Sequence, residues 1–529
     1  MVQVVWFKRD LRISDHQPLT DAVGTGDPVV CLYVVEPDLW ALPDASGRQW
    51  AFVRESLVEL RRDLGSVGGS LIVRTGDVVA LLERLHRQVG VRGLWSHEET
   101  GNGWTYDRDR RVGAWARGAS VPWREVAQNG VVRPLRTRDG WAARWDRTMG
   151  RPVLAAPKAI RTEPSIVAGT IPEASDIGLA PDPCPGRQPG GRDAGVHLLH
   201  TFLQRRGGLY HREMSSPLTA AEACSRLSAH LGYGTLSVRE VSQATWARVA
   251  EVKALPASAR GAWATALRAF VGRLHWHCHF MQKLESAPSI EFRNLHRAYD
   301  GLREGAFDRA RFDAWAFGKT GYPFVDACMR SLIATGWINF RMRAMLVAFA
   351  SYHLWLHWRE TGLHLARLFT DYEPGIHWSQ VQMQSGTTGT NTVRIYNPVK
   401  QSVDQDPEGS FIRRWVPELR DVPGEYIHEP WRMPVALQVT IGCRVAIDYP
   451  EPVIDHVEAA RAARERVWAV RRGDAFRAEA RSILERHGSR KRRSGVSPMP
   501  ARKGSATPSA APASPAVPQL VMDLTGGPA

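Results

Sequence analysis

Two arginines and two acidic residues stand within an apolar, tryptophan-containing stretch of this 529-residue chain. Arg341 and Arg343 fall on an otherwise apolar helical pattern, and Asp371 and Glu373 begin the segment that follows it. Burying an isolated charge costs several kcal/mol, so each of these groups needs a partner or a polar ligand. Two interpretations follow: an ion pair inside a large helical core, or a pocket for a large, polar, flat ligand.

The segments around these charges predict two helices and a loop. Apolar periodicity, with a turn signal at each start, predicts helices over Pro323–Thr335 and Phe340–Glu360, joined by a hinge at 335–337. The stretch 372–391 is almost uncharged and contains three glycines. It predicts an irregular loop whose backbone comes close to a ligand.

The first 150 residues predict a separate α/β domain. Apolar strand patterns at Val2–Phe7, Val29–Val35, Ser70–Arg74, Gly93–His97 and Val121–Val126 alternate with helical patterns such as Arg48–Leu64 and Asp77–Gln88. This alternation predicts a doubly wound parallel sheet. The first strand leads into Lys8-Arg9-Asp10-Leu11-Arg12 and not into a glycine-rich turn, which excludes an ordinary dinucleotide site. Ligands of such sheets bind at the carboxyl ends of the strands, where Glu36, His97 and Glu98 are expected.

The remaining chain divides by composition into three parts. Residues 151–195, rich in Pro, Gly and Asp, predict a linker, and 196–485 predict a large all-α domain. Residues 486–529 predict a basic, disordered Pro/Ala/Ser-rich tail. The net charge of +15 suits a protein that binds phosphates, although an Arg-rich composition gives the same sign by itself.

Several classes of protein are disfavoured by the sequence. The six cysteines form no CxxC pair, so no zinc site or iron–sulfur cluster is expected. In the run from His275 to His279 only these two end residues share a helix face, and no carboxylate completes a metal site. No apolar run reaches membrane-spanning length and no signal-peptide pattern is present, so we expect a soluble, cytoplasmic monomer.

Long motifs in the chain resemble those of the photolyase/cryptochrome family. They are WFKRDLRISDHQPL at the start, then TGYPFVDACMRSL, the TGW hinge, the RMR helix, RIYNPVKQ and RRWVPEL. The resemblance implies an N-terminal accessory domain, which in the family often holds an antenna chromophore, and a helical FAD-binding domain. It further implies DNA containing UV lesions as the partner; the type of antenna, and any signalling partner, are left open.

The resemblance also implies a set of flavin-binding residues. Tyr210 and the run Cys224, Ser225, Arg226, Leu227 and Ser228 match a phosphate clamp, and His277 stands where an Arg usually reaches the phosphates. Arg343 and Asp371 match an ion pair beside the isoalloxazine, and Glu373 matches a carboxylate at its polar edge. The Asn that usually faces flavin N5 is absent. Counting from Asp371 puts His377 there, and counting back from Gly386 puts Gly375 there.

A second set of residues is implied for the lesion and for electron transfer. Trp276 matches the ring on which a flipped pyrimidine dimer stacks. Phe340 and Arg341 stand where the family has Asn-Arg on the hinge helix, a departure in which Arg341 can still hold a phosphate and Phe340 can still stack. Arg273 stands where the dimer-repairing enzymes have Glu. Trp358 matches the middle member of the tryptophan chain and Trp378 its proximal member, whereas Glu304 and Gly305 stand where the distal tryptophan is expected.

Two functions follow from the resemblance. The first is a light-dependent photolyase that splits cyclobutane pyrimidine dimers with an electron from reduced FAD, with single-stranded DNA as a plausible substrate. The second is a cryptochrome-like blue-light receptor without repair activity, which the altered N5 and lesion positions favour. A flavoprotein that binds nucleic acid without light chemistry is disfavoured by Trp358 and Trp378.

Overall fold

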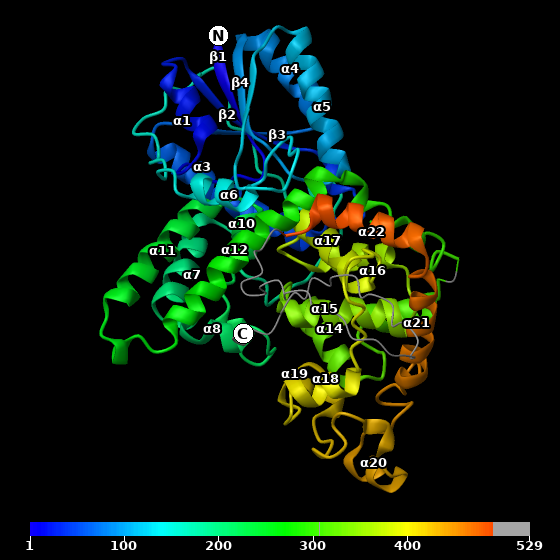
Figure 1. Ribbon diagram of the computed structural model, residues 1–529. Helices are drawn as coiled ribbons and strands as arrows, with labels where there is room; N and C mark the ends of the chain where they lie inside the picture. The colour runs from blue at the N-terminus through cyan, green and yellow to red at the C-terminus, as the bar shows by residue number, and fades with distance from the viewer. Residues whose placement is uncertain (306, 490–529) are drawn as a thin grey trace, which may run out of the picture.

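The computed structural model describes residues 1–305 and 307–489. Its N-terminal part is a five-stranded sheet, and helices form the rest (Figure 1). The strands are β1 (Val2–Phe7), β2 (Val29–Val35), β3 (Leu71–Thr75), β4 (Val91–His97) and β5 (Trp123–Val126). They run parallel in the order β3-β2-β1-β4-β5. The predicted doubly wound sheet followed by an all-α domain is confirmed, with strand ends shifted by up to two residues.

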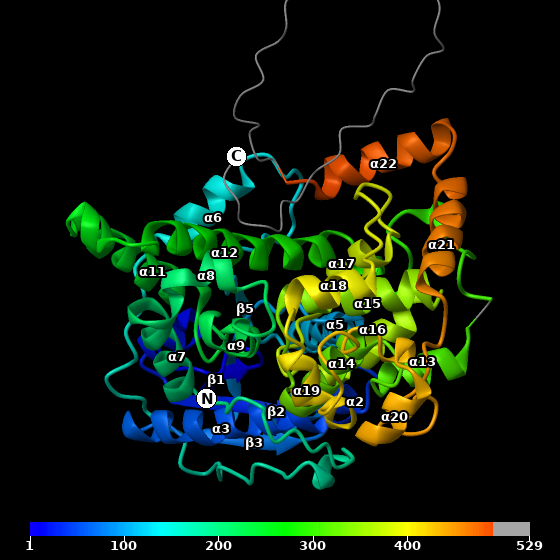
Figure 2. The ribbon, with the colours of Figure 1, turned by 90° about the horizontal axis from the view of Figure 1, so that it is seen from below.

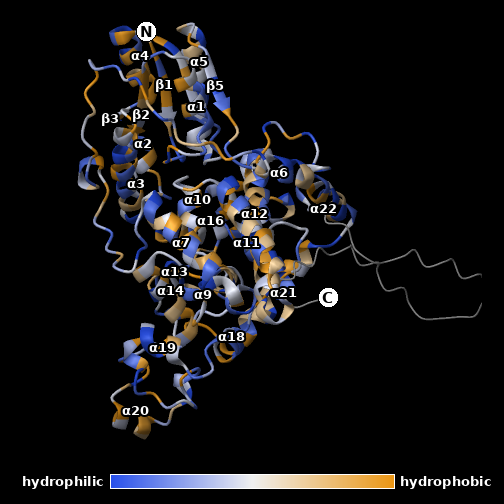
Figure 3. Cartoon of the chain, turned by 90° about the vertical axis from the view of Figure 1, so that its left-hand side faces the viewer, coloured by the Kyte–Doolittle hydropathy of each residue, from blue (hydrophilic) through white to orange (hydrophobic). Residues whose placement is uncertain are grey.

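Helices cover both faces of the sheet. Alternate residues of β1 pack in opposite directions: Val5 and Phe7 join a core with α1 and α3, and Val4 and Trp6 join one with α4 and α5 (Figure 1). Because both faces are buried, the strands are continuously apolar rather than alternating, as Figure 3 shows for β1. The helices here are α1 (Gln17–Gly24), α2 (Pro37–Trp40), α3 (Gly47–Ser66), α4 (Val78–Val89), α5 (Gly103–Gly118) and α6 (Trp141–Met149).

The helical part begins at α7 and surrounds a large apolar core. Its long helix α12 crosses it and packs against α11 and α17 (Figure 2). The bounds are α7 (Arg192–Gln204), α8 (Tyr210–Glu213), α9 (Ala220–Ala223), α10 (Ser228–Gly232), α11 (Val238–Ala254), α12 (Trp263–Ser286), α13 (Arg309–Ala316), α14 (Pro323–Thr335), α15 (Phe340–Ala348), α16 (Trp358–Leu368), α17 (Pro374–Ser385), α18 (Pro398–Gln405), α19 (Ser410–Trp415), α20 (Val435–Ile441), α21 (His456–Val470) and α22 (Asp474–His487).

The predicted continuous helix over Phe340–Glu360 is wrong. Helix α15 ends at Ala348 and passes into a π-helical turn, Phe349–His353. Trp355 then adopts a left-handed backbone with φ of 56°, which no helix can continue through. The His357 side chain accepts from the backbone N–H of Arg359 and begins α16, so Trp358 sits at the start of a new helix.

The predicted loop over 372–391 is also wrong for most of its length, because residues 374–385 form α17. Pro374 fits the first turn, and Gly386, with φ of 79°, ends the helix. The helix carries almost no charge because it is buried on nearly every side. It lacks the polar stripe by which a surface helix is recognised in a sequence.

The end of the chain is described only in part. Helix α22 ends at His487, two residues beyond the predicted limit of the helical region. The predicted tail, 486–529, lies outside the described residues from 490 onward. Within the described part of the chain, no helix has the length and apolar character needed to cross a membrane.

Candidate functional site

A cavity of about 550 Å³ lies in the helical part. Its wall is formed by α8, the segment before α10, α12, the hinge and α15, and α17. The volume falls in the range typical of sites for small organic ligands. The elements that form the wall are far apart in sequence, so the cavity exists only in the folded chain.

Most of the predicted site residues line this one cavity. They are Tyr210, Cys224, Ser225, Arg226, Leu227, Ser228, Arg273, Trp276, His277, Phe340, Arg341, Arg343, Asp371, Glu373 and His377. Trp358 and Trp378 are buried behind the wall. Gly375 packs on α12, where an added Cβ would lie 2.6 Å from the Cα of Met281. Of the two residues proposed for the N5 position, His377 is therefore the one at the cavity.

Arg343 and Asp371 form an ion pair at the cavity wall. The Nη2 atom of Arg343 lies 2.8 Å from Asp371 Oδ2, and its Nε–H donates to the carbonyl of Ile338 at 2.7 Å. The guanidinium lies 4.1 Å from the ring centroid of Phe369. Asp371 Oδ1 is buried without a partner. The ion pair and the pocket thus coexist, because one carboxylate oxygen is left for a ligand that donates a hydrogen bond.

Glu373 is buried at the same wall beside Arg9 of the N-terminal part. Its Oε2 lies 3.4 Å from Arg9 Nη2, and its Oε1 has no partner. Burial raises the pKa of Glu373 to about 7, with Arg9 opposing the rise and Glu99 adding to it. Near neutral pH, Glu373 can therefore either accept or donate a hydrogen bond inside the cavity.

The two cavity histidines are neutral. Burial lowers the pKa of His377 and of His277 to about 4 each. His377 Nε2 lies 2.9 Å from the carbonyl of Gly362, which requires a proton on Nε2 and leaves Nδ1 as an acceptor. His277 stands where the family usually has an Arg, and it supplies no charge.

The segment before α10 presents Arg226 in a strained conformation. Its φ is 60°, unusual for a residue with a side chain, and its guanidinium lies 4.1 Å from the ring centroid of Trp337. Arg226 Nε is buried without a partner. Cations exceed carboxylates around the cavity, where Arg226, Arg273, Arg341, Arg343 and Arg394 face Asp371 and Glu373. An excess of positive charge suits a ligand that carries phosphates.

Two buried tryptophans lead away from the cavity. His377 contacts Trp378, with ring centroids 4.9 Å apart, and Trp378 lies 5.8 Å from Trp358. The indole N–H of Trp358 donates to Asn294 Oδ1 at 2.7 Å. Within the described chain, the rings recorded against Trp358 are Trp378 and His357. Glu304, at the expected distal position, lies 3.8 Å from His357.

Arg273 and Trp276 face the cavity from one side of α12. The guanidinium of Arg273 lies 4.7 Å from the ring centroid of Trp276, and its Nη2 donates to Met214 Sδ at 3.7 Å. Trp276 is half-buried and forms an edge contact with Phe280 at 6.1 Å. The cation and the open ring together suit a stacked base with a nearby anion.

The residues predicted at the carboxyl edge of the sheet belong to two smaller cavities. Glu36 lines a cavity of about 90 Å³, where its Oε2 lies 3.0 Å from Arg108 Nη1. His97 and Glu98 line a crevice of about 20 Å³ that Glu373 also borders. The sequence predicted these residues near a possible ligand site, and in the structure they are distributed over two small spaces, both of which Arg9 also lines.

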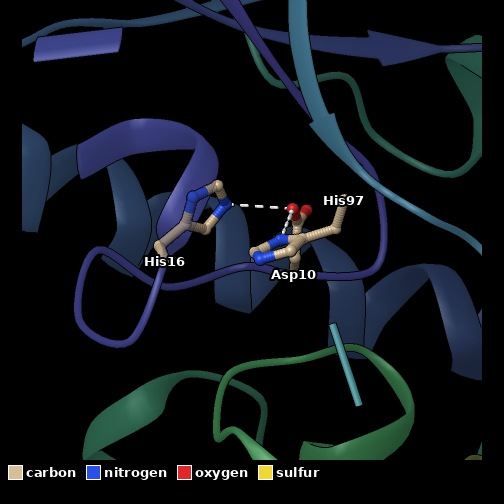
Figure 4. Close-up of side chains that lie close together, drawn as sticks. All are labelled: Asp10, His16 and His97. Carbon is tan, nitrogen blue, oxygen red and sulfur yellow. Dashed lines mark hydrogen bonds and ion pairs between the residues drawn. The ribbon is translucent and has the colours of Figure 1, made fainter. Parts of the chain in front are cut away.

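A buried Asp–His cluster in the N-terminal part has the composition of a metal site. His16 Nε2 lies 2.9 Å and His97 Nδ1 lies 2.8 Å from the same oxygen of Asp10 (Figure 4). His16 Nδ1 accepts from the backbone N–H of Leu19, so its proton is on Nε2. Both rings therefore donate to Asp10, whose other oxygen accepts from the Lys8 N–H. Hydrogen bonds account for the cluster without an ion.

Several cavity residues were not singled out from the sequence. They are Trp337, Asn339, Gln380, Gln384, Arg394 and Tyr396. Arg394 and Tyr396 lie in the RIYNP motif and Trp337 in the TGW hinge, so the motifs contained the signal. Gln380 and Gln384 belong to the helix that was mistaken for a loop. Arg9 lies in the WFKRDLR motif, but the motif gives no sign of its contact with Glu373, because that contact spans the two parts of the chain.

Comparison with known proteins identifies the class. The family model described as DNA photolyase matches residues 3–145, and the model described as the FAD binding domain of DNA photolyase matches residues 270–469. The chain is 30% identical over 475 residues to the deoxyribodipyrimidine photo-lyase of Streptomyces griseus, covering 87% of this chain and 97% of the relative. It is 28% identical over 488 residues to cryptochrome DASH of Gloeobacter violaceus, covering 87% and 94%.

Solved structures of photolyases share the fold of this chain. A bacterial class III photolyase from Agrobacterium tumefaciens superposes with a TM-score of 0.77 at 25% identity, over 89% of this chain and 97% of that one. An archaeal photolyase from Sulfolobus tokodaii, described with two FAD molecules, gives 0.73 at 25% identity, over 89% and 100%. The chain belongs to the photolyase/cryptochrome family, and its cofactor is FAD.

The cavity fits this cofactor. Three acceptors, Asp371 Oδ1, Glu373 Oε1 and Gln380 Oε1, are buried without partners in side chains that line it. The imide N–H and the ribityl hydroxyls of a flavin are donors that such oxygens need. The cations described above suit the pyrophosphate. The individual assignments of residues to parts of FAD stay predictions.

Proposed function

We propose that the protein is a light-dependent DNA photolyase that splits cyclobutane pyrimidine dimers. The observation that carries the proposal is that the residues for a stacked base, Trp276 and Phe340, line the same cavity as the flavin residues. A dimer turned out of DNA into this cavity would therefore lie close to the cofactor. Reduced FAD, when bound, supplies the electron that opens the cyclobutane ring and recovers it afterwards.

The protein's own residues would bind and orient the DNA. Trp276 offers a half-exposed ring face, and aromatic stacking contributes about 1–3 kcal/mol per base. Arg341 and Arg273 supply positive charge for backbone phosphates or for the charge that the substrate gains with the electron. Single-stranded DNA suits the proposal because turning out a base costs least there.

Trp378 and Trp358 would carry electrons toward the cavity. Both are essentially inaccessible to solvent, at 0% and 1% exposure, and their rings are 5.8 Å apart. Such a pair can rereduce the cofactor without opening the cavity to water. An antenna chromophore is a further proposal: the Sulfolobus tokodaii photolyase is described as implying a novel light-harvesting cofactor, and in this chain Glu36 lines a cavity of about 90 Å³ at the carboxyl edge of the sheet.

A second function, a blue-light receptor of the cryptochrome type, is favoured by one feature. Arg273 stands where the dimer-repairing enzymes have a carboxylate, and it contacts no carboxylate in the described chain. A cation there cannot accept a hydrogen bond from a dimer. The similarity to cryptochrome DASH is compatible with either function.

Repair of an oligothymidine containing one dimer, under blue light with reductant, tests the proposal. We expect thymine absorbance to recover in single- and double-stranded substrates. Trp276→Ala should weaken binding of the dimer-containing strand by about tenfold or more, while FAD content stays unchanged. Trp468→Ala is the control, because it removes an exposed tryptophan of α21 that does not line the cavity. Absence of repair by a protein that retains photoreducible FAD would favour the receptor.

A further inference from the structure

Arg9 is the cation nearest the Glu373 carboxylate, and it belongs to the other part of the chain. It lies in the loop after β1, whereas Glu373 begins α17 of the helical part. Its Nε–H donates to the carbonyl of Gly232 at 2.7 Å, and its Nη2 donates to the carbonyl of Tyr372 at 2.8 Å. These bonds aim the guanidinium at Glu373, 3.4 Å away.

The loop that carries Arg9 is held rigidly. Asp10, next to it, is fixed by His16, His97 and the Lys8 N–H, which together leave it no freedom to turn (Figure 4). The carbonyl of Arg9 accepts from Gln128 Nε2 at 2.6 Å. The loop also packs tightly on Gly234, where an added Cβ would collide with that carbonyl. The backbone around Arg9 is therefore held by the N-terminal part, while carbonyls of the helical part orient its guanidinium.

Arg9 is the cation that faces Glu373, whose carboxylate also receives a hydrogen bond from the backbone N–H of Gly375. It borders both the 550 Å³ cavity and the 20 Å³ crevice between the two parts of the chain, so it forms a wall between them. Asp371, two residues earlier, has its own cation in Arg343. No other ion pair of Glu373 is recorded in the described chain. Without Arg9, the carboxylate would have no charged partner against the cost of burial.

We propose that Arg9 is a positioning residue of the flavin site: it fixes the Glu373 carboxylate and sets the charge that Glu373 presents to FAD. The N-terminal part is then more than an accessory to the flavin domain, because it contributes an electrostatic element to the cofactor site. The proposal rests on FAD as the cofactor and is independent of whether the protein repairs DNA.

The ionisation of Glu373 provides the readout. Burial raises its pKa to about 7, and Arg9 keeps it from rising further. The other titratable groups that face it are Glu99, Tyr233 and Cys278. Burial raises the pKa of Tyr233 and of Cys278 above the neutral range, so neither changes charge there. Asp371 and the neutral His277 complete the surroundings.

The experiment is a pH titration of the flavin absorbance of the holoprotein, in the dark and without DNA. We expect a spectral transition near neutral pH that Glu373→Gln abolishes. Arg9→Gln should move the transition upward by about one pH unit, because the ionised carboxylate loses its cation. Arg9→Lys keeps the charge and should leave the transition within a few tenths of its original position.

Arg12→Gln is the matched control. Arg12 also bonds across to the helical part, through the carbonyl of Gly234 at 2.9 Å, but it does not touch Glu373. It should leave the transition unmoved. An unmoved transition in a folded Arg9→Gln protein, or an equal movement in Arg12→Gln, would overturn the proposal. If Arg9→Gln does not fold, two other results would overturn the proposal. One is a large shift of the transition in Arg9→Lys, and the other is a transition that persists unchanged in Glu373→Gln.

Discussion

The 550 Å³ cavity of the helical part and the 90 Å³ cavity at the edge of the sheet share Tyr372 in their walls. In the large cavity, arginines outnumber carboxylates and three acceptor oxygens lack partners. In the small one, Arg108 lies between Glu36 at 3.0 Å and Glu99 at 2.5 Å, and one acceptor oxygen, Glu36 Oε1, is left without a partner. The cofactor site therefore differs from the small cavity in two respects: its larger volume and its excess of arginines over carboxylates.

The largest expected effect is that of Arg343→Leu on the large cavity. It leaves the Asp371 carboxylate, 9% exposed, without its cation, and we expect FAD affinity to fall on the order of 100-fold. Fluorescence titration of the apoprotein with FAD measures this. Arg330→Leu is the control, since it breaks an ion pair with Glu418 at 2.8 Å away from the cavity. Normal FAD content in Arg343→Leu would contradict the assignment.

The next effect concerns Trp378 and Trp358, the pair proposed to carry electrons toward the large cavity. Trp378→Phe replaces the indole between the cavity and Trp358 with a phenyl ring that is much harder to oxidise, so the rate of photoreduction should fall by about tenfold or more. Continuous illumination with reductant, followed by absorbance, measures the rate. Trp315→Phe removes another fully buried indole and should have no such effect. Equal rates in all three proteins would exclude the pair as the route.

A smaller effect is expected at the lesion side of the cavity. Arg273→Ala removes a cation beside Trp276, so affinity for dimer-containing DNA should fall about fivefold. The slope of log affinity against log salt should also become shallower by about one. Fluorescence anisotropy at several salt concentrations measures both. An unchanged salt slope would show that Arg273 does not act on the DNA through its charge.

The smallest effect belongs to the small cavity. Burial raises the pKa of Glu36 to about 7, against the opposing charge of Arg108. The folded state therefore binds this proton more tightly than the unfolded state, and stability falls as pH rises from about 4.5 toward 7. Glu36→Gln should flatten that fall by about 1 kcal/mol without changing FAD content, as urea unfolding at several pH values would show. A loss of FAD would mean that the two cavities are not independent.

The sequence was sufficient to predict the sheet and most of the charged residues of the cavity. Strands such as Val2–Phe7 are continuously apolar because both faces are covered, and this pattern is local. The cavity residues around Arg343 and Asp371 were found because long motifs mark them. The family resemblance supplied their assignment to one site, which residue types alone left undecided between an ion pair and a pocket.

What the sequence missed depends on contacts between distant segments. Helix α17 has no polar stripe because it is buried, and its periodicity is therefore weak. The helix break at Trp355 follows from a left-handed backbone that no local pattern demands. Arg9 contacts Glu373 although the two residues are far apart in sequence. Tyr372, the residue before Glu373, lies 363 positions after Arg9. Only the packing of the sheet against the helical part brings that pair together.

Tyr372 lies at the boundary of the two cavities and donates its hydroxyl to Asp44 Oδ2 at 2.6 Å. A substitution at Asp44 therefore alters a wall of the flavin site that it does not itself touch. Any ligand that enters the sheet-edge cavity and competes for Asp44 would thus act on the flavin site through a single hydroxyl group.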